Sequence, residues 1–347
     1  MSERILICNS QLPFVRGGAE NLVEALAAEL TARGHDVDHL RLPFSLASRG
    51  RVLESALAWR LLDVTAVEGR PVDRVITTRF PSYLVKHPNK VVWLVHQLRQ
   101  VYDLEGTRYS DFHRSDPVDA KVMAIVRAID RRTLGEARRR FAISRTTAER
   151  LDRYCGLEAE VLHPPPRLAG CLRPGTPGDY VLAAGRLDPL KRFDLLVRAL
   201  ARAETAVSVR IAGAGSEADR LADLARQLGV AERVDFLGWV DDAALADLYS
   251  RSLAVFYAPY DEDFGYVTVE AFLSGKPVIT AADSGGVLEL VEDGVSGFVC
   301  DPASPRAIGS CLDRLYRDRD LAAAMGERGR CAVAGIGWER VIARLLS

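Results

Sequence analysis

The sequence predicts an α/β protein made of two doubly wound, Rossmann-like domains. In both halves, short apolar runs alternate with stretches whose apolar residues recur at helical spacing, which is typical of a parallel sheet covered by helices. A chain of 347 residues is long enough for two domains of ordinary size. A proline-rich break near the middle separates the two series.

The first half opens with a strand–helix–strand unit. Residues 4–9 form a short apolar run that we interpret as a buried strand, and residues 19–33 have helical spacing up to Gly34, which ends the helix. Residues 35–42 then return as a second strand, which completes the βαβ unit from which parallel sheets are built. We expect further strands at 72–77, 91–95 and 140–143, and helices at 119–139 and 146–154.

The run Pro164-Pro165-Pro166 forbids regular structure and marks a linker. We therefore expect an N-terminal domain over residues 1–165, a C-terminal domain over 166–330, and a final helix over 331–347 that packs back toward the first domain. In the second half we expect strands at 180–184, 207–212, 234–237, 254–257 and 277–280, and helices at 193–203, 217–228, 243–250 and 268–273. Such sheets bind ligands at the carboxyl ends of their strands.

Composition excludes several classes of protein. Hydrophobic residues make up 48% and the net charge is −1, so we expect a globular protein with no nucleic-acid partner. The apolar run at Ile5–Cys8 is too short for a signal peptide, and no run reaches the length of a membrane span, so any membrane contact is expected to be peripheral. Six cysteines without CxxC spacing indicate reduced thiols, several of them buried, and a cytoplasmic location.

Two glycine pairs follow expected strands. Gly17-Gly18 lies between the first strand and the first helix, where backbone can approach a ligand and N–H groups face an anion; a flexible loop explains the pair equally well. Gly285-Gly286 follows the strand 277–280, where an ordinary turn is the alternative. The first βα unit has no GxGxxG, which disfavours a nicotinamide oxidoreductase.

Charged residues follow two further strands. Arg186 and Lys191 come after the strand 180–184 and could clamp a diphosphate, unless they only form a solvated turn. Glu262 lies in a loop after the strand 254–257, and we expect Glu270 in about the first turn of the next helix. Carboxylates accept hydrogen bonds from sugar hydroxyls, but an acid in a first helical turn can also complement the helix dipole.

In this order and spacing, these features resemble the retaining glycosyltransferases of the GT-B fold, family 4 (glycosyltransferase group 1). The resemblance covers nearly all of the second half, including Ile211–Gly215, Val234–Gly238 and Val269–Ile279. In the first half it depends mainly on Gly17-Gly18 and His96. It implies two Rossmann-like domains that face each other across a cleft.

The resemblance also implies roles for single residues. Glu262 would contact the donor sugar, Glu270 the ribose hydroxyls, and Gly18 the diphosphate from across the cleft. The expected catalytic residues are His96, Arg186, Lys191 and Glu262. The expected donor-binding residues are Gly17, Gly18, Gly213, Val240, Asp242, Phe264, Gly265, Tyr266, Val267, Thr268 and Glu270. For His96, an ordinary surface histidine is the alternative.

The implied reaction is transfer of a hexose with retention, without cofactor or metal. Asp263 stands where many relatives carry glycine, and Asp261-Glu262-Asp263 superficially looks like a metal motif. We expect no metal, because cations and helix termini do the same electrostatic work in this family. The donor is expected to be a nucleotide-diphosphate sugar, GDP-mannose before a UDP-hexose, because Asp242 lies where some relatives read guanine; a simple helix N-cap is the favoured alternative.

The resemblance implies an acceptor that is a glycan, a lipid-linked molecule or a small molecule, and the sequence does not choose among them. A basic run could contact the inner face of the membrane, although a solvated helix face is the simpler interpretation. It consists of Arg127, Arg131, Arg132, Arg138, Arg139 and Arg140. The rival functions are a non-catalytic nucleotide-sugar binding protein and a GT-B phosphorylase, which needs a longer chain and a pyridoxal phosphate lysine.

Overall fold

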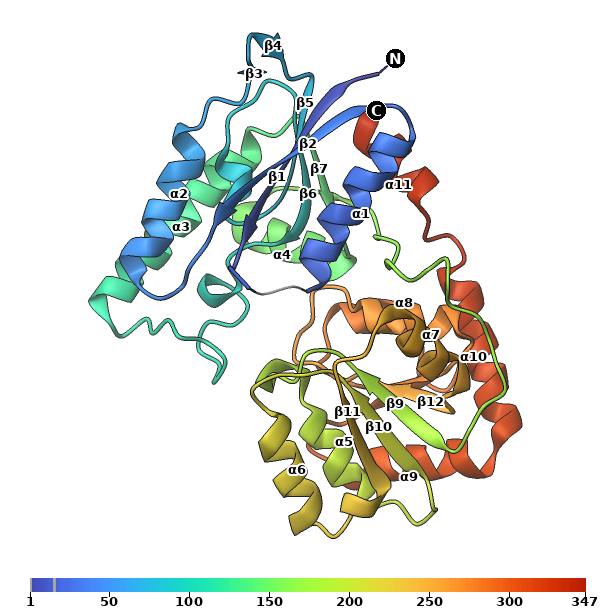
Figure 1. Ribbon diagram of the computed structural model, residues 1–347. Helices are drawn as coiled ribbons and strands as arrows, with labels where there is room; N and C mark the ends of the chain where they lie inside the picture. Colours follow the sequence, from blue (N-terminus) through green and yellow to red (C-terminus); the bar gives the residue numbers. More distant parts are fainter. Residues whose placement is uncertain (1, 15–16) are drawn as a thin grey trace. The chain divides into compact units, whose positions relative to one another are not determined.

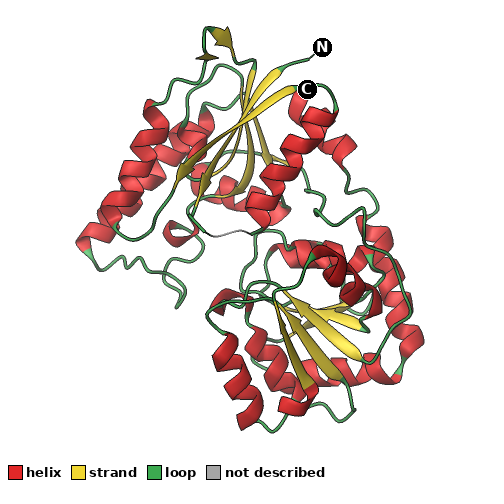
Figure 2. Cartoon of the chain, in the orientation of Figure 1, coloured by secondary structure: helices red, strands yellow, loops and turns green. Residues whose placement is uncertain are grey.

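The computed structural model describes residues 2–14 and 17–347. The chain forms two compact units, Met1–Pro164 with Gly337–Ser347 and Pro165–Ile336. Each unit has a parallel six-stranded sheet with helices on both faces (Figures 1 and 2). The α/β class expected from the sequence is therefore confirmed.

The N-terminal unit has the strand order β2-β1-β5-β6-β7-β8. Its strands are β1 (Arg4–Gln11), β2 (Asp36–Pro43), β5 (Arg74–Arg79), β6 (Lys90–His96), β7 (Arg139–Ala142) and β8 (Glu160–Val161), with a small antiparallel pair β3 (Ala66–Val67) and β4 (Arg70–Pro71). Its helices are α1 (Gly18–Ala32), α2 (Arg49–Leu61), α3 (Pro117–Gly135), α4 (Arg145–Cys155) and α11 (Trp338–Leu346). Figure 1 shows α1 and α11 on one face of this sheet, and α2 and α3 on the other.

The C-terminal unit has the strand order β11-β10-β9-β12-β13-β14. Its strands are β9 (Tyr180–Ala184), β10 (Ser208–Ala212), β11 (Val234–Gly238), β12 (Ala254–Phe256), β13 (Val278–Ala281) and β14 (Gly297–Cys300). Its helices are α5 (Phe193–Leu200), α6 (Ala218–Gln227), α7 (Asp242–Arg251), α8 (Tyr266–Leu273), α9 (Pro305–Arg317) and α10 (Arg319–Val333). Helices α5, α6 and α9 share one apolar core with β9 and β10.

Burial explains why the central strands were visible in the sequence. Val181, Leu182 and Ala183 of β9 are all fully buried, because helices cover both faces of a parallel sheet and its strands become continuous apolar runs.

Local capping residues determine where helices begin and end. Ser144, for example, caps α4 by accepting a hydrogen bond from the N–H of Thr147 (2.9 Å), and Gly156 closes the helix in the left-handed conformation.

The strand order reverses once in each sheet, between β1 and β5 and between β9 and β12. At such a switch point the loops leave neighbouring strands in opposite directions and open a crevice at the carboxyl ends, where doubly wound proteins bind ligands. In the C-terminal unit, the loop after β9 contains Arg186 and Lys191, and the loop after β12 contains Glu262. Topology therefore brings the loops that contain these three residues to the same edge of the sheet.

Some boundaries differ from the sequence-based expectations. The helix expected at 119–139 ends at Gly135, and strand β7 already begins at Arg139. The segment 331–347 is not one helix, because residues 331–333 end α10 and α11 begins at Trp338. Arg74 of β5 donates hydrogen bonds to the carbonyl oxygens of Leu345 (3.0 Å) and Leu346 (2.9 Å), which anchors α11 on the N-terminal unit.

Two further observations concern the surface. Among the helices of the described residues, none has both the length and the apolar character needed to cross a membrane. Of the cysteines, Cys8, Cys155 and Cys300 are buried as expected, whereas Cys171 and Cys331 are exposed.

Candidate active site

The centre of the candidate site is an ion pair at the switch point of the C-terminal unit. The ammonium group of Lys191 contacts the carboxylate of Glu262 and donates a hydrogen bond to the phenol oxygen of Tyr257 (3.1 Å). The three side chains come from the loop after β9 and from the segment after β12. Both charged side chains are about one-fifth exposed, 20% for Lys191 and 19% for Glu262, so a ligand can reach them.

Opposing effects set the charge of Lys191. Burial acts to lower its pKa, but the carboxylate of Glu262 and the phenol of Tyr257 outweigh burial and leave the pKa raised above its usual value. The pKa of Tyr257 is also raised, by burial and by Glu262. The site therefore holds a permanent cation beside a carboxylate and a neutral phenol.

Arg186 adds a second cation to the same loop. Its guanidinium donates a hydrogen bond to Asp188 (2.8 Å), and its side chain is about half exposed. The other oxygen of Asp188 accepts from the backbone N–H of Lys191 (3.2 Å), which starts a short 3₁₀ turn. The turn explains how two cations five residues apart lie on one loop.

Glu270, which the sequence analysis expected in about the first turn of its helix, lies just beyond that turn. Helix α8 begins at Tyr266, so Glu270 is in its second turn and the helix dipole gains little from it. Its carboxylate accepts a hydrogen bond from the phenol of Tyr249 on α7 (2.8 Å), and burial raises its pKa against the effect of this bond. Tyr249 is a partner that the sequence analysis missed.

The backbone between the two glutamates forms a helix start. Gly265 caps α8 in the left-handed conformation with φ 88°, and Phe264 is buried before it. The N–H groups of Tyr266 and Val267 lie in the first turn, where a helix offers no internal partners. The N–H of Thr268 is already bonded to the carbonyl of Gly265 (3.0 Å), but within the described residues the Thr268 hydroxyl is buried without a hydrogen-bond partner.

The glycine pair Gly285-Gly286 packs against the Glu262 loop. The N–H of Gly286 donates to the carbonyl of Glu262 (2.8 Å), and a Cβ added to Gly285 would lie 2.5 Å from that carbonyl oxygen. Gly285 has φ 60°, which side chains other than glycine rarely adopt. The pair is thus needed for close backbone contact, and neither of the two sequence interpretations, ligand loop or ordinary turn, included this role.

Two expected donor residues also have structural roles. A Cβ added to Gly213, at the end of β10, would collide with the carbonyl of Gly185. Asp242 is not the N-cap of α7, because Asp241 accepts the capping bond from the N–H of Ala244 (2.8 Å). The carboxylate of Asp242 pairs instead with the guanidinium of Arg167. Val240, in the connection before α7, is half-buried.

In the N-terminal unit, the Gly17-Gly18 loop is held by a buried charge pair. Gly17 caps α1, and its N–H donates to the carboxylate of Glu20 (2.9 Å). Arg79, at the end of β5, contacts the same carboxylate and donates to the carbonyl of Ser10 (2.9 Å). Gly18 is the first residue of α1, so its N–H has no partner inside the helix. Sequence analysis missed both members of this pair.

His96 is the last residue of β6 and is half-buried. Its Nδ1 lies 2.6 Å from the carbonyl oxygen of Gln97. The Gln97 side chain points into the unit, where its amide approaches the carboxylate of Asp130 (3.5 Å) and the thiol of Cys155 (3.3 Å). Burial raises the pKa of Asp130 to about 7.

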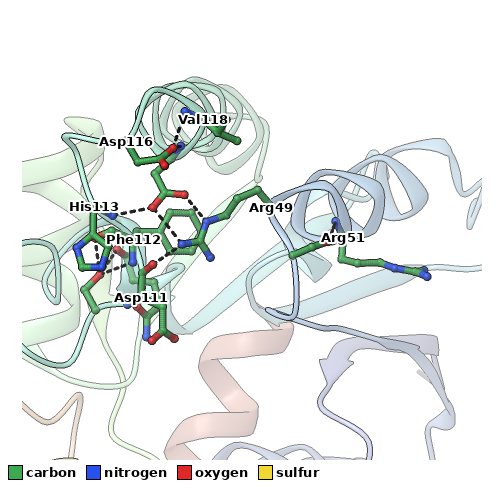
Figure 3. Close-up of polar contacts among 11 residues, drawn as sticks. Arg49, Arg51, Asp111, Phe112, His113, Asp116 and Val118 are labelled. Carbon is green, nitrogen blue, oxygen red and sulfur yellow. Dashed lines mark hydrogen bonds and ion pairs between the residues drawn. The ribbon is translucent and has the colours of Figure 1, made fainter.

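A cavity of about 540 Å³ lies beside the connection between β6 and α3 in the N-terminal unit, lined by Glu105, Gly106, Phe112, His113, Arg114 and Ser115. Figure 3 shows how Arg49 of α2 reaches this connection: its guanidinium lies over the ring of Phe112, 3.8 Å from the centroid, and contacts the carbonyl of Asp111. Arg49 also pairs with Asp119, whose pKa falls to about 2, chiefly through this hydrogen bond. The wall of the cavity is therefore firmly held.

The basic run does not form one exposed patch. Arg127 contacts Glu105 and the carbonyl of Val101, and Arg140 donates to the carbonyl of Glu158 (3.0 Å). Arg131, Arg132 and Arg138 are exposed, and Arg139 is half-buried.

Comparison with solved structures defines the class of fold. The chain matches sucrose-phosphate synthase from Thermosynechococcus elongatus with a TM-score of 0.79 at 20% identity, over 99% of this chain and 97% of that one. It matches HepE from Anabaena in complex with UDP and glucose with a TM-score of 0.71 at 19% identity, over 98% and 99%. The chain has the GT-B fold of glycosyltransferases.

Sequence comparison gives the family. Residues 173–331 match the family described as glycosyl transferases group 1, so this segment, which contains the Lys191–Glu262 site, belongs to that family. A D-inositol 3-phosphate glycosyltransferase of Nocardia farcinica is 31% identical over 271 residues, which are 73% of this chain and 60% of the relative. One of Salinispora arenicola is 37% identical over 48% of this chain and 40% of the relative. The chain thus spans at most about 60% of the length of these two relatives.

Proposed function

We propose that this protein is a glycosyltransferase that moves a hexose from a nucleoside diphosphate sugar to an acceptor hydroxyl. The observation that carries the proposal is the Lys191–Glu262 pair at the switch point of a unit that belongs to the group 1 family. A cation beside an acceptor of hydroxyl hydrogen bonds suits a ligand with a diphosphate at one end and a sugar at the other.

We assign the work of the reaction to charge and position. Negative charge grows on the diphosphate as the bond to the sugar breaks, and Lys191 with Arg186 would stabilise it. The departing diphosphate would help to deprotonate the acceptor on the face that it leaves, which gives retention at the anomeric carbon. The side chains of Glu262 and Glu270 would hold the sugar and the ribose, and the first N–H groups of α8 the phosphates.

We propose that no divalent metal is needed. Lys191 already neutralises the carboxylate of Glu262, and a cation in that position takes the electrostatic role that a metal has at other diphosphate sites. Addition of EDTA should therefore leave the rate unchanged.

For the donor we propose a UDP-hexose ahead of GDP-mannose. The expectation of GDP depended on Asp242, whose carboxylate pairs with Arg167. HepE from Anabaena, which shares the fold, was solved in complex with UDP and glucose. Both donors belong in the assay, because Arg167 and Asp242 are about half exposed and an exposed pair can exchange partners.

For the acceptor we propose a small phosphorylated polyol first, because the similar curated proteins are D-inositol 3-phosphate glycosyltransferases. The cavity beside Arg114 and His113 is large enough for such a molecule. Glycan and lipid-linked acceptors are the next candidates, and a membrane contact through Arg127–Arg140 stays a prediction that flotation with anionic vesicles tests.

The test is a turnover assay in which UDP-glucose and GDP-mannose are each combined with inositol phosphate, and release of the nucleotide and the anomeric configuration of the product are measured. Transfer with retention supports the proposal, and inversion contradicts the retaining mechanism. Tight binding of a donor with no release of nucleotide for any acceptor would favour the alternative, a non-catalytic nucleotide-sugar binding protein.

A further inference from the structure

Arg192 has an unusual backbone for its residue type. It directly follows Lys191 and takes the left-handed conformation, with φ 50° and ψ 42°. Residues other than glycine rarely adopt this region, and where they do, surrounding contacts hold them there, commonly at functional sites. The contacts of its side chain are therefore informative.

The guanidinium of Arg192 is buried and makes four hydrogen bonds to two other loops. It donates to the carbonyl oxygens of Ala258 and Pro259, both at 2.8 Å, in the segment that leads to Glu262. It also forms a bidentate pair with the carboxylate of Asp283, at 2.7 and 2.6 Å, in the loop after β13. All four bonds use the planar array of N–H donors of the guanidinium group, which lysine lacks.

Asp283 continues the network toward Glu262. Its carbonyl accepts from the N–H of Asp261 (2.9 Å), and two residues further along the chain Gly285 pairs with Glu262 in an isolated parallel bridge. One side chain thus ties together the loops that follow β9, β12 and β13. Glu262 is held on its backbone side by this network and on its carboxylate side by Lys191.

The pairing of Arg192 with Asp283 also argues against a direct role for Arg192 in binding the diphosphate. In the sequence it is a second basic residue directly after Lys191. Four of its five N–H groups donate to Asp283 and to two carbonyls, and its charge is paired with Asp283, so we assign it no direct contact with an anion.

We infer that Arg192 and Asp283 are positioning residues that fix the Glu262 carboxylate against the Lys191 ammonium group. The inference rests on the proposed function, in which Glu262 contacts the donor sugar and Lys191 the diphosphate. Loss of the network should harm steps that need the sugar in place and spare the binding of a nucleotide without sugar.

The test compares Arg192→Gly and Arg192→Lys with wild type. Glycine can adopt the left-handed backbone without strain, and lysine keeps the positive charge but lacks the planar guanidinium group. A matched control is Arg233→Lys, because Arg233 also donates to three backbone carbonyls of this unit, at Leu200, Thr205 and Val207. The readouts are release of UDP from UDP-glucose, the Kd of UDP by calorimetry, and the melting temperature.

We expect both Arg192 variants to lower the kcat of UDP release at least tenfold and to change the Kd of UDP less than about twofold. Arg233→Lys should lower the melting temperature without changing kcat. Equal losses in kcat and UDP affinity, or an unchanged kcat in both Arg192 variants, would overturn the inference. If the Arg192 variants do not fold, Asp283→Asn removes one charge at constant size. It is expected to lower the kcat of UDP release while leaving the Kd of UDP nearly unchanged.

A wild-type protein that neither binds UDP or GDP nor releases either nucleotide from its sugar would instead refute the proposed function. Hydrogen exchange of the amides over residues 257–264, measured without any ligand, still decides the inference in that case. Exchange there should rise in Arg192→Gly and not in Arg233→Lys; equal exchange in both would contradict a positioning role.

Discussion

The ammonium group of Lys191 and the carboxylate of Glu262 form an ion pair where the strand order reverses in the C-terminal unit. The two residues are far apart in sequence, and each follows one of the two strands that flank the switch point, β9 and β12. Because the strands of a parallel sheet point the same way, the loops that follow them lie at one edge of the sheet. The topology therefore brings Lys191 and Glu262 together, and the proposed chemistry depends on this ion pair.

Glu262→Gln should shift the pH range of activity downwards. In the wild type, Glu262 keeps the pKa of Lys191 raised although burial lowers it. Without that carboxylate, burial prevails and Lys191 loses its proton at a lower pH. We expect kcat/KM for the donor to fall overall by about 10²–10³, as for loss of one stabilising group, and its alkaline limb to move to lower pH. A pH–rate profile from 6 to 10 in which the variant loses no more activity at high pH than the wild type would contradict this coupling.

Tyr249→Phe should weaken nucleotide binding in a pH-dependent way. The variant removes the bond to Glu270 that opposes the burial-driven rise in its pKa, so Glu270 takes up its proton at a higher pH. We expect about tenfold weaker UDP binding, from a hydrogen bond to a charged group, with the loss largest at low pH. Calorimetry at pH 5.5 and 8 measures the affinity for UDP.

Tyr180→Phe is the matched control for Tyr249→Phe, because its phenol donates to the carbonyl of Leu248 on the same helix. It should lower stability and leave UDP affinity unchanged. Equal effects of the two variants on affinity would show that the loss comes from α7 as a whole.

Gly285→Ala should reduce activity through steric contact with the Glu262 loop. Its φ of 60° and the 2.5 Å approach of an added Cβ to the Glu262 carbonyl both oppose alanine. Gly294→Ala is the matched control. Gly294 also has a left-handed backbone, with φ 71°, but an added Cβ would meet only open space. Each should lose about 1 kcal/mol of stability from the left-handed backbone, and only Gly285→Ala should lose more than that and lower kcat as well. Similar melting temperatures and similar rates in the two variants would rule out the contact.

Glu20→Ala should destabilise the N-terminal unit strongly. It removes the acceptor of the Gly17 N–H and leaves the largely buried guanidinium of Arg79 without its charged partner, which costs about 3–5 kcal/mol. Glu24→Ala on the same helix breaks a half-exposed pair with Arg41 at 3.8 Å and should cost less than about 1 kcal/mol. Urea unfolding of both variants compares them, and comparable losses would contradict the role of the buried pair.

Asp130 should make the protein less stable as pH rises toward neutrality. Its pKa is about 7 in the folded chain against 3.8 in the reference state, so between these values the folded state holds a proton that the unfolded state has released. The free energy of unfolding then falls by about 1.4 kcal/mol per pH unit for this group. Asp130→Asn should flatten the profile between pH 5 and 7, and an unchanged slope would contradict the raised pKa.

The buried strands could be predicted from the sequence, for a physical reason. Strands such as β9 are covered on both faces and leave a continuous apolar run. Arg186, Lys191 and Glu262 follow such strands, so their place at the carboxyl edge followed from the strand assignments. Helix α2 has a weakly amphipathic sequence and was not predicted.

The partners of the site could not be predicted, because they depend on contacts between distant segments. Arg192 reads as one more basic residue after Lys191, and only its bonds to Ala258, Pro259 and Asp283 reveal its place. Tyr249 and Glu270 belong to different helices, and their hydrogen bond has no local signature. Arg79 pairs with Glu20 across the other switch point in the same way.

Calorimetric titration of UDP and GDP into the wild type and Lys191→Ala tests the central claim most directly, because it needs no acceptor. We predict one saturable site per chain for at least one of the two nucleotides, and loss of most of that affinity in Lys191→Ala with an unchanged circular dichroism spectrum. No binding of either nucleotide, or equal binding by the variant, would contradict the proposed site.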